Sequence, residues 1–82
     1  MKLTDLPLRN RVDWFRVIVD LERAGMSQAQ IGVAVGRSQA QINNYKTIPD
    51  TEPRFHVGLL LLALWWDAGG DPAGLPMVAV VA

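Results

Sequence analysis

The chain contains no cysteine, and His56 is its single histidine. Without cysteine there is no disulfide bond, thiolate zinc site or cysteine nucleophile. One histidine is too few for a histidine-rich metal site. No nucleophile with a matching acid accompanies His56 in the sequence, so we expect it to cap a helix or to pack in the core. These absences predict a protein that is not an enzyme and uses no metal, cofactor or small-molecule ligand.

Long hydrophobic runs are absent as well. The longest apolar run, residues 57–66, is ten residues long, whereas a membrane-spanning helix needs about 20. No apolar segment follows Lys2, which argues against a signal peptide. We therefore expect a cytoplasmic protein that has no membrane partner.

Acidic residues are missing from the middle of the chain, although the overall charge is balanced. Eight basic and eight acidic residues cancel, yet no acid occurs between Glu22 and Asp50. Arg23, Arg37 and Lys46 lie in this interval, so the N-terminal half is mildly positive. Half of the residues are hydrophobic, which favours a folded domain over disorder.

Prolines and glycines divide the chain into an N-terminal arm (residues 1–9), a helical domain (10–70) and an apolar tail (71–82). The apolar spacing predicts four helices, the first capped by Asn10 and running to about Ala24, then 27–35, 38–46 and 54–68. The expected fold class is therefore all-α, a compact bundle of four to five short helices. The tail is expected either to form a short strand that pairs with a second copy of the chain or to fray.

Two capped helices joined across one glycine are the main feature of the domain. Ser27 with Gln30, and Ser38 with Gln41, fit the capping box, in which the two side chains satisfy backbone amides at a helix start. Gly36 lets the chain take a positive backbone angle and turn sharply between the helices. Two capping boxes in succession thus predict a helix, a tight turn and a second helix.

The apolar residues of this segment indicate how the two helices pack. Ile31 and Val35 share one face of the earlier helix, and Ile42 and Tyr45 share one face of the later helix. Gly32 has no side chain to hold the helices apart, so it permits a close crossing. These positions predict a tightly packed helix pair over residues 28–47.

Residues 28–47 read QAQIGVAVGRSQAQINNYKT. This pattern resembles the helix-turn-helix of the lambda repressor and Cro family of phage regulators. It has a polar glutamine first, an apolar residue three positions on, a small residue next, glycine at the turn and two apolar positions in the second helix. The resemblance covers Arg11 to Lys46 and fades through the linker. It implies a phage-type transcriptional repressor that binds double-stranded DNA.

The outward face of the later helix is rich in carboxamides. At 100° per residue, Ala40 points opposite the buried side and the asparagines lie about 50° to either side of it. Carboxamides can read the edge of adenine, and alanine can touch the thymine methyl group. The residues predicted to read bases in the major groove are Ser38, Gln39, Ala40, Gln41, Asn43 and Asn44.

Phosphate contacts are expected around this face. Arginine and lysine add positive charge, and helix N-termini attract phosphate. Gln28 is included because the family pattern implies it. The predicted phosphate-binding residues are Gln28, Arg23, Arg37, Lys46 and Arg54.

The apolar helix over residues 54–68 must be covered on all sides. Three short helices cannot easily cover a fourth, and exposed apolar surface marks contacts. We therefore expect a homodimer, and the predicted interface residues are Leu61, Leu64, Trp65, Val78 and Val80. The alternative is that this helix is the centre of the monomer, wrapped by the first helix and the tail.

Sequence-specific binding to a near-palindromic operator is thus the leading hypothesis. Two other functions stay open. One is a phage DNA-packaging or recombination accessory that uses the same helix pair on DNA. The other is a protein-interaction adaptor that uses the apolar helix and the tail.

Overall fold

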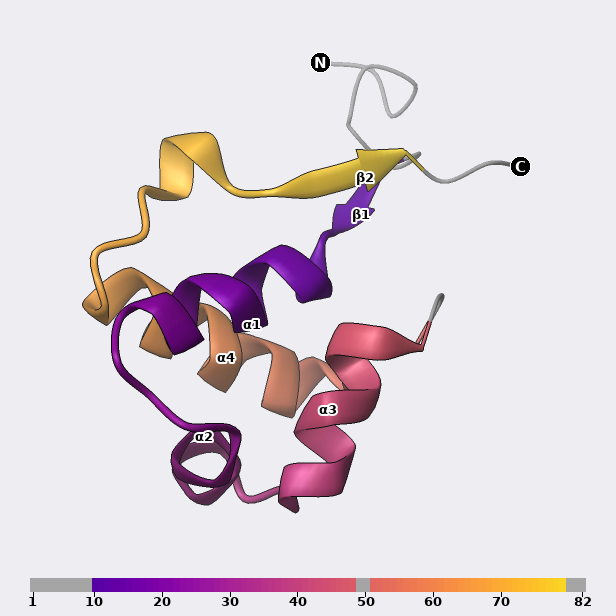
Figure 1. Ribbon diagram of the computed structural model, residues 1–82. Coiled ribbons are helices and arrows are strands. Elements are labelled where there is room, and N and C mark those ends of the chain that lie inside the picture. Colours follow the sequence, from indigo (N-terminus) through magenta and orange to yellow (C-terminus); the bar gives the residue numbers. More distant parts are fainter. Residues whose placement is uncertain (1–9, 49–50, 80–82) are drawn as a thin grey trace.

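Seven short elements follow one another in the computed structural model, which describes residues 10–48 and 51–79 (Figure 1). In chain order they are β1 (Asn10–Val12), α1 (Trp14–Arg23), α2 (Gln28–Val35), α3 (Gln39–Thr47), α4 (Phe55–Asp67), a 3₁₀ turn (Pro72–Gly74) and β2 (Met77–Ala79). The four α-helices of the described residues confirm the predicted all-α bundle. The N-terminal arm (1–9) and Val80 lie outside the described residues.

The first helix begins later than predicted. Asp13, not Asn10, caps α1, and its carboxylate accepts the backbone N–H of Arg16 at 3.2 Å. The residues before the cap are extended and pair antiparallel with β2, so that Val12 lies opposite Met77. The prediction of a helix from Asn10 was wrong because this long-range pairing takes up the backbone groups that a first helical turn would need.

The tail forms a strand, but its partner is in the same chain. β2 pairs with β1 as a two-stranded ribbon, and the N–H of Asp13 donates to the carbonyl of Pro76 at 2.9 Å to extend the ribbon by one bond. The expected pairing of the tail with a second copy is therefore replaced by a pairing with the segment before α1. Val78, predicted for a dimer interface, lies within this ribbon.

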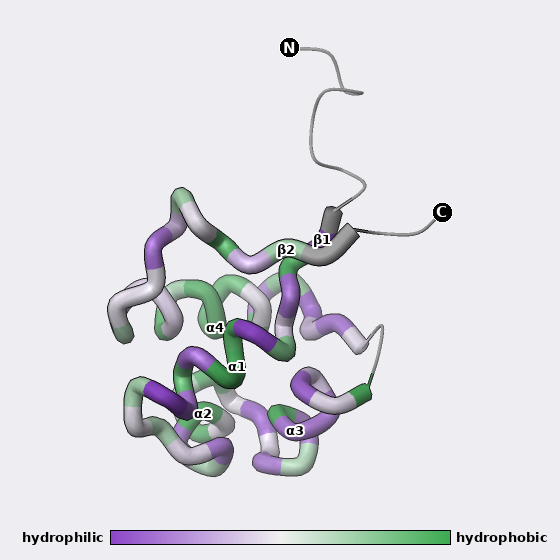
Figure 2. The backbone as a smooth tube through the Cα atoms, turned by 45° about the horizontal axis from the view of Figure 1, so that its top comes forward, coloured by the Kyte–Doolittle hydropathy of each residue, from purple (hydrophilic) through white to green (hydrophobic). Residues whose placement is uncertain are grey.

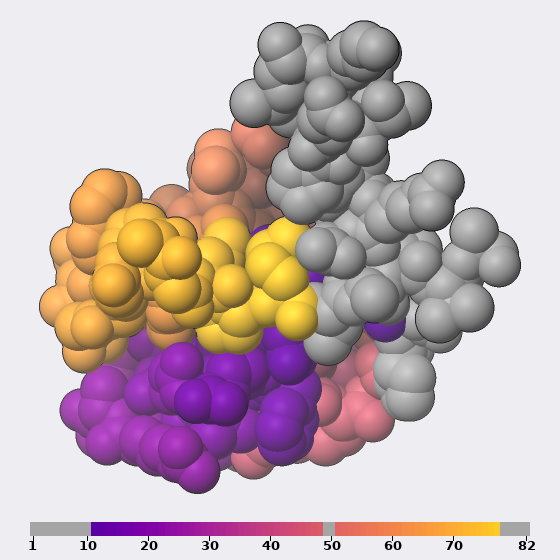
Figure 3. Space-filling view, turned by 90° about the horizontal axis from the view of Figure 1, so that it is seen from above, coloured from indigo at the N-terminus to yellow at the C-terminus, as the bar shows by residue number. Residues whose placement is uncertain are grey.

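Figure 1 shows α1 and α4 crossing the middle of the molecule, with α2 and α3 on one side of them and the ribbon on the other. Figure 3, which looks onto the ribbon side, shows the C-terminal segment lying beside α1. The helix pair α2–α3 therefore projects from the part of the molecule opposite the ribbon. In the described residues, no helix is both long and apolar enough to cross a membrane.

Each helix contributes one face to a single core. Figure 2 shows that α4 is apolar along most of its length, and its inward face meets α1 and α2. Burial of each large aliphatic side chain contributes roughly 1.5–3 kcal/mol. The buried residues are Val17, Ile18, Leu21, Ile31, Val35, Ile42, Tyr45, Val57, Leu61 and Trp65.

Two residues of the predicted dimer interface belong to this core. Leu61 is fully buried and Trp65 is 5 % exposed within the monomer. They were assigned to an interface because α4 is apolar all round, but their side of the helix packs on α1 and α2. Leu64 is half-buried against the core. His56, expected in the core or at a cap, is exposed in the first turn of α4.

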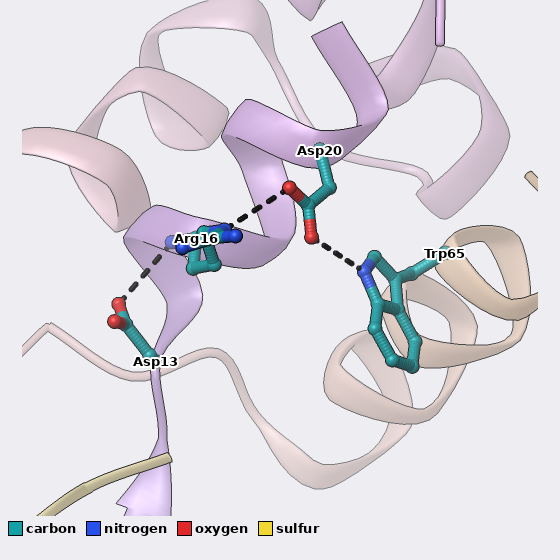
Figure 4. A network of polar contacts seen from close by, with 4 residues as sticks. All are labelled: Asp13, Arg16, Asp20 and Trp65. Carbon is teal, nitrogen blue, oxygen red and sulfur yellow. Dashed lines mark hydrogen bonds and ion pairs between the residues drawn. The ribbon is translucent and has the colours of Figure 1, made fainter. Parts of the chain in front are cut away.

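One polar contact fixes α4 against α1. The indole N–H of Trp65 donates to Asp20 Oδ2 at 3.0 Å, and Asp20 Oδ1 accepts from Nε of Arg16 at 3.2 Å (Figure 4). A partly buried indole N–H needs an acceptor. Asp20 therefore stabilises the orientation of the largest core side chain and ties the two central helices together.

Candidate nucleic-acid interface

The helix pair begins with a complete capping box. The Oγ of Ser27 accepts the N–H of Gln30 at 3.1 Å, and Oε1 of Gln30 accepts the N–H of Ser27 at 2.9 Å, as predicted. At the other end of α2, Gly36 takes φ of 73° in the left-handed region. Only glycine adopts this conformation freely, so the sequence places the turn between α2 and α3.

Gly32 has a sharper role than the predicted close crossing of two helices. A Cβ built at Gly32 would collide with the carbonyl oxygen of Arg37, in the turn itself. The N–H of Arg37 donates to the carbonyl of Gly32 at 2.8 Å. The backbone of Arg37 thus packs directly against Gly32, where any other residue would place its Cβ. This contact sets the position of α3 relative to α2.

The second capping box forms only in part. Ser38 Oγ accepts the N–H of Gln41 at 3.2 Å, but the return bond from the Gln41 side chain does not form. Gln41 is half-buried and lines a hollow beside the start of α3. The α3 helix is therefore capped by Ser38 alone, and the carboxamide of Gln41 stays available for another partner.

The outward face of α3 carries the carboxamides as predicted. Gln39, Ala40 and Asn43 are exposed, Asn44 is half-buried, and Ile42 and Tyr45 are buried on the opposite side. The helix contains no acid. An exposed row of amide groups without carboxylates can donate and accept hydrogen bonds without repelling an anionic partner.

The carboxamide row is connected to the start of α2. Nε2 of Gln28 donates to Oδ1 of Asn43 at 3.4 Å, and the hydroxyl of Thr47 donates to the carbonyl of Asn43 at 2.8 Å. With its side-chain oxygen engaged, Asn43 keeps its amide N–H groups for an external acceptor. Gln28 and Asn43 thus form one polar patch that spans both helices of the pair.

A hollow of about 450 Å³ lies on the other flank of α3. It brings together Arg37, from the turn, and Arg54, from the residue before α4. Glu52 also contributes to its wall, but this carboxylate lies 3.9 Å from the guanidinium of Arg11. The hollow is lined by Gly36, Arg37, Ser38, Gln41, Tyr45, Glu52 and Arg54. Two exposed arginines beside the N-terminus of α3 form a place for an anion.

Two predicted phosphate residues lie elsewhere. Lys46 is half-buried and its ammonium lies 2.9 Å from Oε1 of Glu22, which compensates its charge. Arg23 is exposed but lines a separate hollow with the C-terminal end of α4, whereas Arg54 stands at its N-terminal end. Lys46 thus joins α1 to α3 within the fold, Arg23 lies apart from Arg37 and Arg54, and the phosphate roles of Lys46 and Arg23 stay predictions.

These features were not predictable from the sequence because each joins segments far apart in the chain. The Glu22–Lys46 pair bridges α1 and α3, and the hollow combines the turn with the segment before α4. A local pattern such as a capping box carries no signal for either contact. In the described residues, no group of histidine and acidic side chains could hold a metal ion.

The geometry thus offers a carboxamide face flanked by a Gln28–Asn43 patch and by a hollow with two arginines. No protein-family model matches the chain, and neither a curated protein nor a solved structure matches it.

Proposed function

We propose that this protein binds double-stranded DNA in a sequence-specific manner and lays α3 in the major groove. The observation that carries the proposal is the exposed, acid-free carboxamide face of α3, held outward by a capped α2 and a glycine turn. A helix of this size fits the major groove, where each base pair presents a distinct set of donors and acceptors.

The base contacts follow from side-chain chemistry. Gln39 and Asn44 can each make paired hydrogen bonds to adenine, in which the side-chain oxygen accepts from N6 and the amide donates to N7, and Ala40 can contact a thymine methyl group. Asn43 offers N–H donors, because its side-chain oxygen already accepts from Gln28. We infer a preference for A·T pairs at the centre of each half-site.

The phosphate contacts lie on the two flanks of α3. Gln28 stands at the N-terminus of α2 on one flank, and Arg37 with Arg54 borders the hollow on the other. Such contacts position the protein without reading sequence. Since the chain has no net charge, non-specific binding is weak, and base contacts supply a large share of the affinity.

The pattern of residues 28–47 resembles that of lambda repressor and Cro, which supports a small phage-type repressor acting in the cytoplasm. Two copies of the chain would read half-sites about one helical turn apart on a near-palindromic operator. Occupation of such a site next to a promoter represses transcription by excluding the polymerase.

Replacing Asn43 by alanine tests the assignment of the base-reading face. Asn43→Ala removes a donor from an exposed position, so the fold is retained while discrimination against a wrong base pair falls by about 1–3 kcal/mol. Fluorescence anisotropy with the preferred duplex and a base-substituted duplex measures this difference. Equal discrimination by the variant and the wild type contradicts the assignment.

Replacing two cations by glutamine tests the assignment of the phosphate contacts. Arg37→Gln is expected to weaken binding to all duplexes alike and to lower the salt dependence by about 0.9 log unit of affinity per log unit of salt. Lys46→Gln is the matched control, since Glu22 already compensates this charge, and should leave the salt slope unchanged. A larger loss of salt slope for Lys46→Gln than for Arg37→Gln contradicts the assignment of the phosphate contact to Arg37.

A further inference from the structure

One side of α4, which the other helices leave partly uncovered, carries a row of four apolar side chains, three of them exposed. Phe55 is 81 % exposed, Leu59 50 % and Trp66 64 %, and Leu62 is half-buried between them. Steps of four, three and four residues place all four on one side of a helix. We call Phe55, Leu59, Leu62 and Trp66 the outer stripe of α4.

The outer stripe combines projecting rings with adjacent hollows. One hollow, of about 390 Å³, lies at the Phe55 end, where Val12, Trp14 and Pro53 help to line it. A second, of about 180 Å³, lies at the Trp66 end and is bordered by Leu62 and Leu75. Each end therefore presents both a ring that can insert and a space that can receive one.

We propose that the outer stripe is the surface through which two copies of this chain associate, with their α4 helices antiparallel. The 4-3-4 spacing reads the same in both directions. A two-fold axis between residues 60 and 61 therefore sets Phe55 against the partner's Trp66 and Leu59 against the partner's Leu62. A two-fold interface requires a self-complementary surface of this kind.

The exposed polar groups beside the stripe agree with this pairing. On one flank of it, His56 stands near the start of α4 and Asp67 at its end, and both are exposed. An antiparallel arrangement brings each imidazole to the carboxylate end of the other copy. A parallel arrangement would instead place the two Asp67 carboxylates together, and like charges repel.

The size of the stripe is also appropriate for a second copy. Two largely exposed aromatic rings and two leucines offer roughly 400–500 Å² of apolar surface, which is as large as the main patch of a typical monomer. Two copies would therefore bury roughly 800–1,000 Å² in total, which is the range of small, weakly associating interfaces. This inference rests on the proposed function at one point, because an operator with two half-sites requires two copies of the chain.

The association is tested on the free protein by sedimentation equilibrium. Wild-type chain is expected to be dimeric at about 100 µM, and Leu59→Glu to raise the dimer dissociation constant at least about 30-fold. Val33→Glu is the matched control, because Val33 is 86 % exposed on α2, and it should leave the dimer intact. Circular dichroism checks that each variant is folded.

The antiparallel register is tested by cross-linking, which a cysteine-free chain makes specific. Mixed Phe55→Cys and Trp66→Cys chains should form a disulfide, whereas Phe55→Cys alone should not, because its two copies are roughly 17 Å apart along the helix axes. The other end of the mixed dimer keeps its native Phe55–Trp66 contact.

A wild-type chain that stays monomeric overturns the proposal and leaves the outer stripe as a site for a different protein. A dimer that survives Leu59→Glu, or that cross-links through Phe55→Cys alone, overturns it equally. Neither assay contains DNA. A dimer that binds no duplex therefore contradicts only the proposed function. A monomer that binds duplex contradicts the inference drawn from the stripe and leaves the assignment of α3 to the major groove intact.

Discussion

At the scale of single residues, the shape of the candidate interface depends on two glycines, because neither has a side chain. Gly36 has the positive φ that the turn requires, and Gly32 leaves room for the carbonyl oxygen of Arg37. The sequence predicts the turn at Gly36 and a close approach at Gly32, because glycine between two capping signals and glycine inside a helix are local features. It does not identify Arg37 as the contact, since this depends on how the turn folds back.

Adding one methyl group at Gly32 tests this contact. Gly32→Ala forces a Cβ against the backbone carbonyl of Arg37, and backbone cannot rotate away as a side chain can. We expect a loss of about 1–3 kcal/mol in the free energy of unfolding, together with weaker DNA binding. Urea denaturation followed by circular dichroism measures the stability.

Gly74→Ala is the control for this substitution. A Cβ at Gly74 meets no atom within 4 Å, so the change in unfolding free energy should stay within about 0.5 kcal/mol. Equal free energies of unfolding for the Gly32 and Gly74 variants would show that the carbonyl of Arg37 does not pack closely against Gly32.

At the scale of elements, the helices with local signals were predicted well and the elements with distant partners were not. Boundaries of α2, α3 and α4 agree with the sequence to within about two residues, because capping residues and glycines mark them. The start of α1 was misplaced, and neither expectation for the tail, a strand paired with a second copy or a frayed end, included a pairing with the segment before α1. Both depend on the β1–β2 ribbon, which joins the two ends of the described chain.

The Asp20–Trp65 hydrogen bond is the clearest link between elements. Asp20→Ala leaves a partly buried indole N–H without its acceptor, and we expect a loss of about 1–3 kcal/mol in unfolding free energy. Asp20→Asn keeps an oxygen acceptor and should lose less. Thermal denaturation with calorimetry compares the two variants.

Arg16→Gln separates this bond from the neighbouring ion pair. Arg16 forms an exposed pair with Asp20 one helical turn apart, and such pairs contribute at most about 0.5 kcal/mol. If Arg16→Gln destabilises the protein as much as Asp20→Ala, the role of Asp20 is to hold Arg16 and not Trp65.

At the scale of the whole molecule, α4 has one side that is buried in the core and one that is largely exposed. Its inner side supplies Leu61 and Trp65 to the core, and Phe55, Leu59 and Trp66 of its outer stripe remain exposed. The hydropathy of the sequence could not separate these sides, because a helix that is apolar all round has no polar face to orient it. The fold removes this ambiguity because α1 and α2 pack against α4, and Leu61 and Trp65 are buried in the shared core.

The packing of the helices also explains how neutral amides and cations are distributed over the candidate interface. The carboxamide face was predictable because helical periodicity alone sets which side of α3 is turned outward. Two other features were not predictable. Glu22 pairs with Lys46, and Arg54 lines the same hollow as Arg37. Both depend on how α1, α3 and the segment before α4 pack together. Cations are thus concentrated on one flank of α3, and the central face is left to neutral amides.

The most direct test of the central claim is selection of bound duplexes from a random DNA library by the wild-type chain. We expect enrichment of an A·T-containing half-site, repeated with two-fold symmetry at about one helical turn. The enrichment should be lost when Asn43 is replaced by alanine. Recovery of no duplex at low salt, or of duplexes without a shared sequence, would contradict the assignment of α3 to the major groove.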